Sequence, residues 1–418
     1  MLCAGPFSVS TQRKNKMTST TQNTPRRSIG LALAGGGPLA AVYEIGVLAA
    51  LEESIEGLDV NDADIYVGIS AGGIIAAALA NGITPHQMCR LFIESDVDAA
   101  DGAALFKPEL LLRPATAEIS RRLAMLPGLL ASSLFHYARH RRSVFASFER
   151  LKEALPAGIL SGAGIDRYLK ATFARAGRTN DFRKLRNRLV IVATDLDTGE
   201  AVRFGQQGWD AVPISKAVEA SAAVPGLFPP VDINGHHFVD GAVRKSMHAS
   251  IALEAGVDML FCVNAIVPYN SRGRELGNAP GKLSSGGLLD VLSQTLRSIL
   301  HSRIASGMAS YEKSHPGVDI LLFQPSQEDA QLFFTNIFGY SNRREMCEKA
   351  YQNTRLELLE RRAEIAPKLA RHGLKLKLNV LRDTSLSLVQ QAPSRQALAR
   401  LRQTLDDLER YLKVADSR

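Results

Sequence analysis

The hydrophobic pattern near the start of the chain predicts two strand–turn–helix units in succession. An apolar run over residues 28–34 is typical of a buried strand, and three glycines and a proline follow it. Since proline suits the first turn of a helix, we expect a helix over about 38–53. Residues 65–67 form a second apolar run. Small and apolar residues after Ser70 then predict a helix that ends at Asn81-Gly82.

The same alternation continues through the middle of the chain. Residues 189–194 predict a strand that turns into 201–204, and the turn between them is typical of a hairpin. A helix is expected around 213–222, and further strands are expected over 237–239, 259–263 and 320–323. Strands that alternate with helices imply a mostly parallel sheet covered on both faces. We therefore predict an α/β fold.

Residues 103–142 have a different pattern, in which leucine-rich stretches are interrupted by Pro108, Pro114 and Pro127. This pattern predicts broken amphipathic helices, because proline removes a hydrogen bond from a helix interior. Two interpretations stay open for this segment. One is a lid or membrane-facing cap, and the other is an insertion packed on the core.

These patterns divide the chain into four parts. Residues 1–27 are polar and basic, and we expect a disordered tail there. Residues 28–255 hold the strand–turn–helix units, residues 256–354 continue the α/β domain, and residues 355–418 form a helical C-terminal extension. Leucines between 398 and 412 recur every three or four residues. That stripe favours docking on the same chain over a coiled-coil contact.

Composition and charge exclude several classes of protein. Hydrophobic residues make up 45% of the 418 and charged residues 22%, which is ordinary globular usage. The four cysteines lie far apart without a CxxC pair, which argues against a zinc site or a disulfide framework. The net charge of +8 is concentrated at the two ends, and no nucleic-acid motif accompanies it. Basic ends suit peripheral contact with an anionic membrane, and solvated tails are the alternative.

We expect no targeting signal and no membrane-spanning segment in this sequence. No segment reaches the roughly 18 consecutive apolar residues that a membrane span needs. Polar residues, not an apolar stretch, follow the basic residues near the N-terminus, so we predict no signal peptide. We expect a cytoplasmic protein, with peripheral membrane contact left open. Met1 and Met17 are both candidate start positions.

The sharpest chemical motif is the sequence G-x-S-x-G at Gly68, Ser70 and Gly72. It lies between an apolar strand and a helix of small residues, which is the context that a nucleophile elbow requires. Glycines are needed on both sides because a Cβ atom there would collide with the tight turn. We therefore predict that Ser70 is an exposed nucleophile at the end of a strand.

A glycine run at Gly35, Gly36 and Gly37 lies at the end of the first strand. Three glycines allow backbone N–H groups to converge, as an oxyanion hole requires. The same geometry suits a phosphate, although the Walker lysine is absent and the dinucleotide pattern fits only loosely. Tight packing between helix and strand is a further explanation of this run.

Asp240 ends a strand and precedes Gly241 and Ala242. A serine hydroxyl needs a base, and a buried aspartate can take its proton directly. The alternative is a triad, because Ser70, Asp240 and His248 follow the chain order of α/β-hydrolases. The short spacing and an expected helix over 247–254 argue against His248 as the base.

Another aspartate pair, Asp195 and Asp197, invites a calcium-loop interpretation. An EF-hand loop has glycine at its sixth position and glutamate at its twelfth, and neither is present here. We therefore predict no metal site in this turn.

The order of these motifs resembles the patatin-like phospholipase family. The resemblance covers about 29–255 and extends more loosely to about 355, and it includes the segments 193–200 and 220–230. It implies a three-layer α/β/α fold and a Ser–Asp dyad without a histidine base. By matching position, Ser70 is the nucleophile and Asp240 the proton acceptor.

The resemblance also implies the remaining parts of the site. The N–H groups of Gly35, Gly36 and Gly37 line the oxyanion hole, and no metal or organic cofactor is needed. The implied activity is hydrolysis of lipid acyl esters, in the manner of a phospholipase or lysophospholipase.

The chain departs from the family pattern directly after the glycine run. There the family has any residue, then Arg or Lys, then Gly, whereas this chain has Pro38, Leu39 and Ala40. The loss of this cation removes a partner for a lipid phosphate. It therefore bears on the head group more than on the hydrolysis.

Two rival functions stay open. One is a general esterase or thioesterase that acts on soluble substrates, and the other is a non-catalytic membrane-binding scaffold on the same fold. The intact Ser70 and Asp240 argue against the scaffold. The apolar residues 103–135 and the aromatic run 332–340 are candidates for an acyl channel or membrane face, with ordinary core packing as the alternative.

Overall fold

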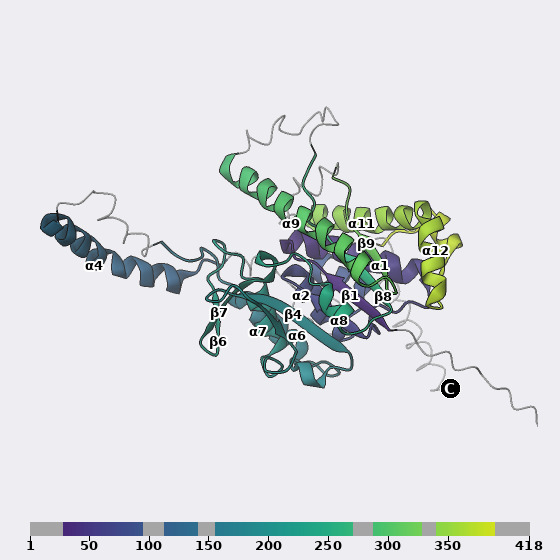
Figure 1. Ribbon diagram of the computed structural model, residues 1–418, viewed down its shortest axis with the longest axis horizontal. Coiled ribbons are helices and arrows are strands. Elements are labelled where there is room, and N and C mark those ends of the chain that lie inside the picture. Colours follow the sequence, from purple (N-terminus) through teal and green to yellow (C-terminus); the bar gives the residue numbers. More distant parts are fainter. Residues whose placement is uncertain (1–27, 95–112, 141–154, 271–286, 328–339, 389–418) are drawn as a thin grey trace, which may run out of the picture.

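The computed structural model describes residues 28–94, 113–140, 155–270, 287–327 and 340–388 (Figure 1). The basic tail, the leucines at 398–412 and residues 332–339 of the aromatic run lie outside the described residues. The four-part division of the chain stays a prediction.

An eight-stranded sheet forms the centre of the described structure (Figure 1). Its strand order is β6 (Val231–Ile233), β7 (His236–Asp240), β4 (Arg188–Asp195), β3 (Ile65–Gly68), β1 (Ile29–Leu33), β8 (Met259–Val263) and β9 (Asp319–Phe323), and β5 (Ala201–Phe204) pairs with β4. From β4 to β9 all neighbours are parallel. The pairs β4–β5, β4–β7 and β6–β7 are antiparallel. The predicted mostly parallel sheet and the hairpin of β4 and β5 are confirmed.

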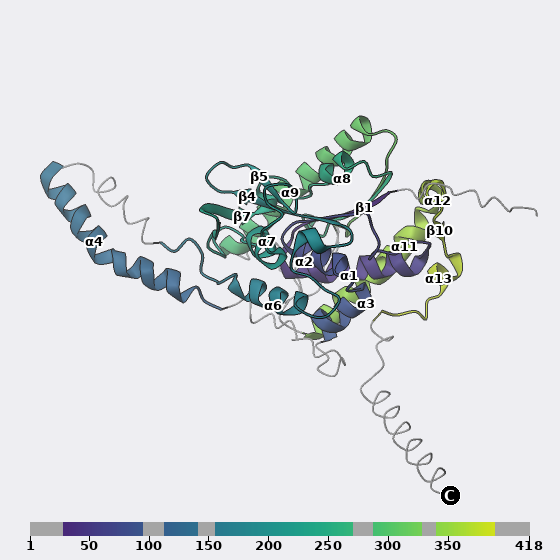
Figure 2. The ribbon, with the colours of Figure 1, turned by 90° about the horizontal axis from the view of Figure 1, so that it is seen from below.

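Helices cover both faces of this sheet, and the alternation of side chains along the strands explains why (Figure 2). In β1, Leu31 and Leu33 pack into one hydrophobic core. Ala32 and Ala34 point to the other face and pack into a second core. A strand that is buried on both faces requires two such layers. The predicted three-layer α/β/α fold is confirmed.

The larger core holds most of the helices. It includes α1 (Gly37–Ser54), α2 (Ala71–Ala80), α3 (Pro85–Met88), the π-helix η1 (Cys89–Glu94), α6 (Ala163–Phe173), the short 3₁₀ turn η4 (Phe182–Lys184), α7 (Ile214–Ser221), α11 (Tyr340–Glu360), α12 (Arg362–Arg371) and α13 (Leu378–Arg382). The smaller core lies beneath α8 (Ser250–Glu254) and α9 (Gly287–Ser314). A two-stranded sheet joins β2 (Ile55–Glu56) to β10 (Lys375–Leu376).

The C-terminal helical region is packed onto the first helix. A Cβ atom on Gly46 of α1 would lie 2.4 Å from the carbonyl oxygen of Cys347 in α11, so only glycine allows this close approach. The helix α11 runs from residue 340 to 360 and so crosses the predicted boundary at 355. The helical character predicted beyond that residue is confirmed by α12 and α13.

Several helices differ from the sequence-based prediction. α4 (Thr116–His140) is one continuous helix through Pro127, not a broken one, since its flanking leucines and alanines favour the helix. It extends away from the body in both views (Figures 1 and 2). α8 begins at Ser250, three residues later than expected. α6, α9 and the part of α11 before residue 355 were not predicted. No described helix is long and apolar enough to cross a membrane.

Candidate active site

The pairing of β4 brings the ends of two strands together. Gly68, at the end of β3, lies opposite Ile191 of β4. Asp240, at the end of β7, lies opposite Ala193, two residues further along β4. β5 pairs with β4 at both Ile191 and Ala193, and so occupies one edge of β4 there. β3 and β7 must therefore lie one after the other along the opposite edge of β4, with their ends adjacent. The turns after these two strands therefore carry Ser70 and Asp240 to the same place.

Ser70 lies in a tight turn between β3 and α2. Its backbone has φ 53° and ψ −121°, in the positive-φ region that non-glycine residues rarely adopt. The flanking glycines make room for this turn. A Cβ atom on Gly68 would lie 2.6 Å from the carbonyl oxygen of Gly72, and one on Gly72 would lie 2.5 Å from that of Leu33. The strand–turn–helix context expected of this motif is present. The predicted exposure of Ser70 is wrong: only 3% of its surface is exposed, because it lines a cavity instead of the outer surface.

The glycine run lies directly beside Ser70. A Cβ atom on Gly35 would lie 3.1 Å from the Cβ of Ser70. Gly36 and Gly37 have positive φ values of 149° and 70°, and α1 begins at Gly37. The N-terminus of a helix carries partial positive charge from its unpaired N–H groups. This end of α1 therefore faces the serine with an environment suited to an anion.

Asp240 is buried beside Ser70, with 4% of its surface exposed. Its Oδ1 accepts a hydrogen bond of 2.8 Å from the N–H of Ala242, at the start of the 3₁₀ turn η5 (Gly241–Val243). Burial raises the pKa of Asp240 and outweighs the lowering effect of the Ala242 N–H and the Ser70 hydroxyl, so that the pKa is about 6. The carboxylate is therefore ionised at neutral pH and is a stronger base than an exposed aspartate.

Ser221, to which the sequence analysis assigned no role, connects the turn at Ser70 to the central sheet through two hydrogen bonds. Ser221, the last residue of α7, accepts a hydrogen bond of 2.8 Å from the backbone N–H of Ser70. Its own hydroxyl donates to the carbonyl oxygen of Val192 in β4 at 2.6 Å. Ser221 is completely buried. It therefore satisfies the amide of the strained turn and fixes its position against β4.

We expect Ser221→Ala to lower the free energy of unfolding by about 1–3 kcal/mol, because it leaves the buried N–H of Ser70 unpaired. We expect turnover per folded molecule to fall about tenfold, because Ser70 is displaced. Ser215→Ala is a matched control, since Ser215 is a buried serine of the same helix that donates to Asp166 instead. Equal loss of turnover in both variants would contradict a positioning role for Ser221.

The histidine of the alternative triad lies in a different environment. His248 is buried, and its Nε2 has no hydrogen-bond partner among the described residues. Burial, with a smaller contribution from the nearby Lys245 and Arg203, lowers the pKa of His248 to about 3. His248 lines a cavity with Arg203 and Lys245, and that cavity does not include Ser70.

Asp195, for which a calcium loop was considered, stabilises the turn between β4 and β5. Oδ1 of Asp195 accepts hydrogen bonds from the N–H groups of Asp197 and Thr198, at 2.9 and 3.1 Å. Its Oδ2 lies 3.0 Å from Nδ1 of His236, whose ring packs edge-on against Trp209. Within the described part of the chain, no group of three or more His, Cys, Asp or Glu side chains is placed to hold a metal ion.

A cavity of about 580 Å³ opens over Ser70 and Asp240. Its walls are mainly apolar and include Leu39, Val224, Pro225, Leu227, Val243, Ala265, Ile266, Leu296, Ile299 and Leu300. Gly36 and Gly37 also line it. α9 supplies one wall, so a helix that the sequence did not predict belongs to this site. The cavity can hold an apolar chain beside Ser70, Asp240 and a helix N-terminus.

Comparison with known families agrees with this geometry. The model of the patatin-like phospholipase family matches residues 31–253, which is more than half of the chain. The chain belongs to this family. The matched span begins in β1 and ends in α8, so it contains the glycine run, Ser70 and Asp240 of this patatin-like phospholipase domain.

Individual relatives of this patatin-like chain are distant. The probable lipid hydrolase 463L of Invertebrate iridescent virus 6 is 24% identical over 224 residues, which are 52% of this chain and 61% of that protein. The uncharacterized protein R571 of Acanthamoeba polyphaga mimivirus is 24% identical over 213 residues, or 50% of this chain and 57% of that protein. The chain thus spans less than two thirds of these curated relatives.

Among solved structures, the chain is similar to VipD from Legionella pneumophila, with 16% identity and a TM-score of 0.33. That alignment covers 78% of this chain and 67% of VipD. The type III effector protein ExoU is also 16% identical, with a TM-score of 0.34 over 81% of this chain and 54% of the other. At these scores, the family assignment rests on the matched family model alone.

Proposed function

We propose that this member of the patatin-like phospholipase family hydrolyses lipid acyl esters through a dyad of Ser70 and Asp240. The observation that carries the proposal is that both side chains lie in one largely apolar cavity beside the N-terminus of α1. The carboxyl of Asp240 is buried and more basic than usual, and it lines the same cavity as the Ser70 side chain. A neutral histidine base is not required.

In the first half of the proposed reaction, Ser70 Oγ attacks the ester carbonyl carbon while the carboxylate of Asp240 takes the hydroxyl proton. The carbonyl oxygen becomes an oxyanion, which the N–H groups of the glycine run 35–37 stabilise. Collapse of this intermediate breaks the bond to the alcohol oxygen. Asp240 returns its proton to the leaving alcohol, and the acyl group stays on Ser70.

In the second half, a water molecule attacks the acyl-serine carbonyl and gives a proton to Asp240. The bond to Ser70 Oγ then breaks, Oγ regains the proton, and the fatty acid leaves. The N–H groups of the glycine run stabilise this second oxyanion in the same way.

The apolar wall of α9 supports a lipid substrate over a small soluble ester. Leu296 and Ile299 line the cavity and yet are about half exposed, at 51% each. Leu292, one turn earlier, is 54% exposed. Exposed apolar side chains at the mouth of a cavity favour contact with a lipid surface. We propose that the enzyme works in the cytoplasm and meets its substrate at a membrane periphery.

The test is a substrate panel in which fatty acid release from phospholipid vesicles and from monoacylglycerols is measured beside hydrolysis of soluble short-chain esters and thioesters. We expect higher kcat/KM for long acyl chains, and activity that rises when the lipid aggregates. Preference for soluble short chains without any rise would favour the general esterase or thioesterase. Vesicle binding without any turnover would favour the scaffold.

A further inference from the structure

Two arginines from elsewhere in the chain line the cavity beside the glycine run, which lacks the cation of the family pattern. Among the residues that line the cavity over Ser70, the charged ones are Asp240, Arg297 and Arg303. Both arginines belong to α9, on the stripe that faces the cavity with Ser293, Leu296 and Leu300 at spacings of three or four. Six residues of helix place them about 9 Å apart along its axis.

The two arginines differ in environment. Arg297 is half-buried at the apolar wall and lies 3.5 Å from the carbonyl oxygen of Val267, and burial lowers the pKa of its guanidinium. Arg303 is exposed and donates to the carbonyl oxygen of Val243 at 3.2 Å. Val243 ends the short turn that begins after Asp240. Arg303 therefore touches the segment that positions the proposed base.

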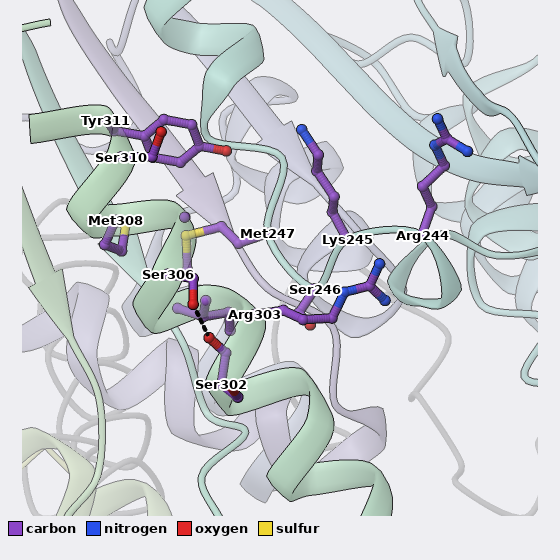
Figure 3. Close-up of a pocket in the computed structure, with 12 residues that line it drawn as sticks. Arg244, Lys245, Ser246, Met247, Ser302, Arg303, Ser306, Met308, Ser310 and Tyr311 are labelled. Carbon is purple, nitrogen blue, oxygen red and sulfur yellow. Dashed lines mark hydrogen bonds between the residues drawn. The ribbon is translucent and has the colours of Figure 1, made fainter. Parts of the chain in front are cut away.

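Arg303 also lines a second cavity of about 490 Å³, so the two cavities meet at this side chain (Figure 3). The charged side chains that line the second cavity are Arg303, Arg244 and Lys245, and none is acidic. Figure 3 shows Arg303 reaching from α9 toward the segment that carries Lys245 and Ser246. Five hydroxyl-bearing residues, Ser246, Ser302, Ser306, Ser310 and Tyr311, line it together with the apolar Met247, Ile304 and Met308. The hydroxyls of Ser246 and Ser306 donate to the carbonyl oxygens of Leu300 and Ser302. The second cavity thus joins three cations to a partly apolar wall.

We propose that Arg303 and Arg297 bind an anionic phosphate group of the ester substrate, with the head group lying in the second cavity and the acyl chain in the first. This inference rests on the proposed function and assigns the residues and the cavity that bind the head group. Guanidinium groups suit phosphate because they offer paired donors in one plane. Asp240 is itself an anion, so a phosphate beside it needs such compensating cations.

The experiment compares two esters that differ only in the phosphate. Dibutanoyl phosphatidic acid and dibutanoylglycerol both dissolve as monomers, so attraction to a vesicle surface plays no part. We expect wild type to prefer the phosphatidic acid. Arg303→Gln is expected to lower kcat/KM for that substrate at least about tenfold more than for dibutanoylglycerol, mainly through KM. The double variant Arg297→Gln, Arg303→Gln should abolish the preference. When Arg297→Lys replaces Arg297→Gln in that double variant, part of the preference should return.

Lys313→Gln is the matched control. Lys313 is an exposed cation of the same helix that lines neither cavity. This variant should keep the wild-type preference. An equal fall on both esters in the arginine variants, or no phosphate preference in wild type, would overturn the proposal.

A binding measurement separates this proposal from the proposed function. Glycerol 3-phosphate is titrated calorimetrically into wild type and Arg303→Gln, without any turnover. Binding that is lost in the variant supports the phosphate site even where no ester is hydrolysed. No binding to wild type contradicts it. Equal affinity for inorganic phosphate would assign the site to the free ion and overturn the head-group assignment.

Discussion

Replacing Ser70 by alanine is expected to abolish ester hydrolysis, with a loss of about five orders of magnitude in kcat/KM. A loss of this size is typical when a covalent nucleophile is removed, because no other group can form the acyl intermediate. The fold should persist, since alanine fills the space of the buried serine and removes only its hydroxyl. The measurement is steady-state hydrolysis of a lipid ester, with circular dichroism and melting temperature as the check on folding.

A folded Ser70→Ala variant with more than about one hundredth of wild-type activity would contradict the assignment of the nucleophile. Ser132→Ala is a suitable control, because this hydroxyl lies on α4 and donates to the carbonyl oxygen of Leu129. That variant should retain wild-type kcat and KM.

Asp240→Asn is expected to lower kcat/KM by about three orders of magnitude, because an amide cannot take the serine proton. The asparagine oxygen can still accept the hydrogen bond from Ala242, so the turn should keep its shape. Removal of His248 in His248→Ala should leave most of the activity, since its imidazole lines a different cavity. A severe loss in His248→Ala with a mild loss in Asp240→Asn would replace the dyad with a triad.

The pH dependence follows from the same carboxyl group. Burial raises the pKa of Asp240 to about 6, and only the ionised form can accept a proton. Wild-type kcat/KM should therefore fall as the pH drops below about 6 and level off above it. The residual activity of Asp240→Asn should lack this acid limb. A pH profile in which the variant keeps the same limb would contradict the role of Asp240 as the base.

As the pH rises through about 6, the contribution of Asp240 to the free energy of unfolding should fall while its contribution to activity rises. Since the folded pKa of Asp240 is raised, the protonated form favours folding at low pH, and that contribution is lost as the pH rises through about 6. Asparagine carries no charge to bury. At pH 8, Asp240→Asn should therefore raise the free energy of unfolding, by up to about 3 kcal/mol.

Local sequence patterns predict the strands, turns and helices around the site, but they do not predict that Asp240 lies beside Ser70. The apolar run of β1, the glycines after it and the motif at Ser70 each depend on a few neighbouring residues, so periodicity and turn chemistry reveal them. The approach of Asp240 to Ser70 depends on β7 pairing with the edge of β4 beyond the end of β3. No local pattern encodes that pairing, and only the family resemblance implied it.

The parts of the site that the sequence did not reveal have physical reasons. α9 exposes Leu292, Leu296 and Ile299 while burying Leu300 and Ile304, so its apolar positions do not form a single core-facing stripe. Ser221 is one small buried serine in a helix, and its two hydrogen bonds reach residues that are distant in sequence. Side chains of this kind acquire a role only through tertiary contacts.

The most direct test of the central claim is labelling with a fluorophosphonate, which reacts with an activated serine and loses fluoride. Wild type, Ser70→Ala and Asp240→Asn are compared by intact mass under conditions in which all three are folded. We predict one adduct on wild type, none on Ser70→Ala and strongly slowed labelling of Asp240→Asn. An unlabelled wild type, or an adduct that persists in Ser70→Ala, would contradict a hydrolase built on Ser70 and Asp240.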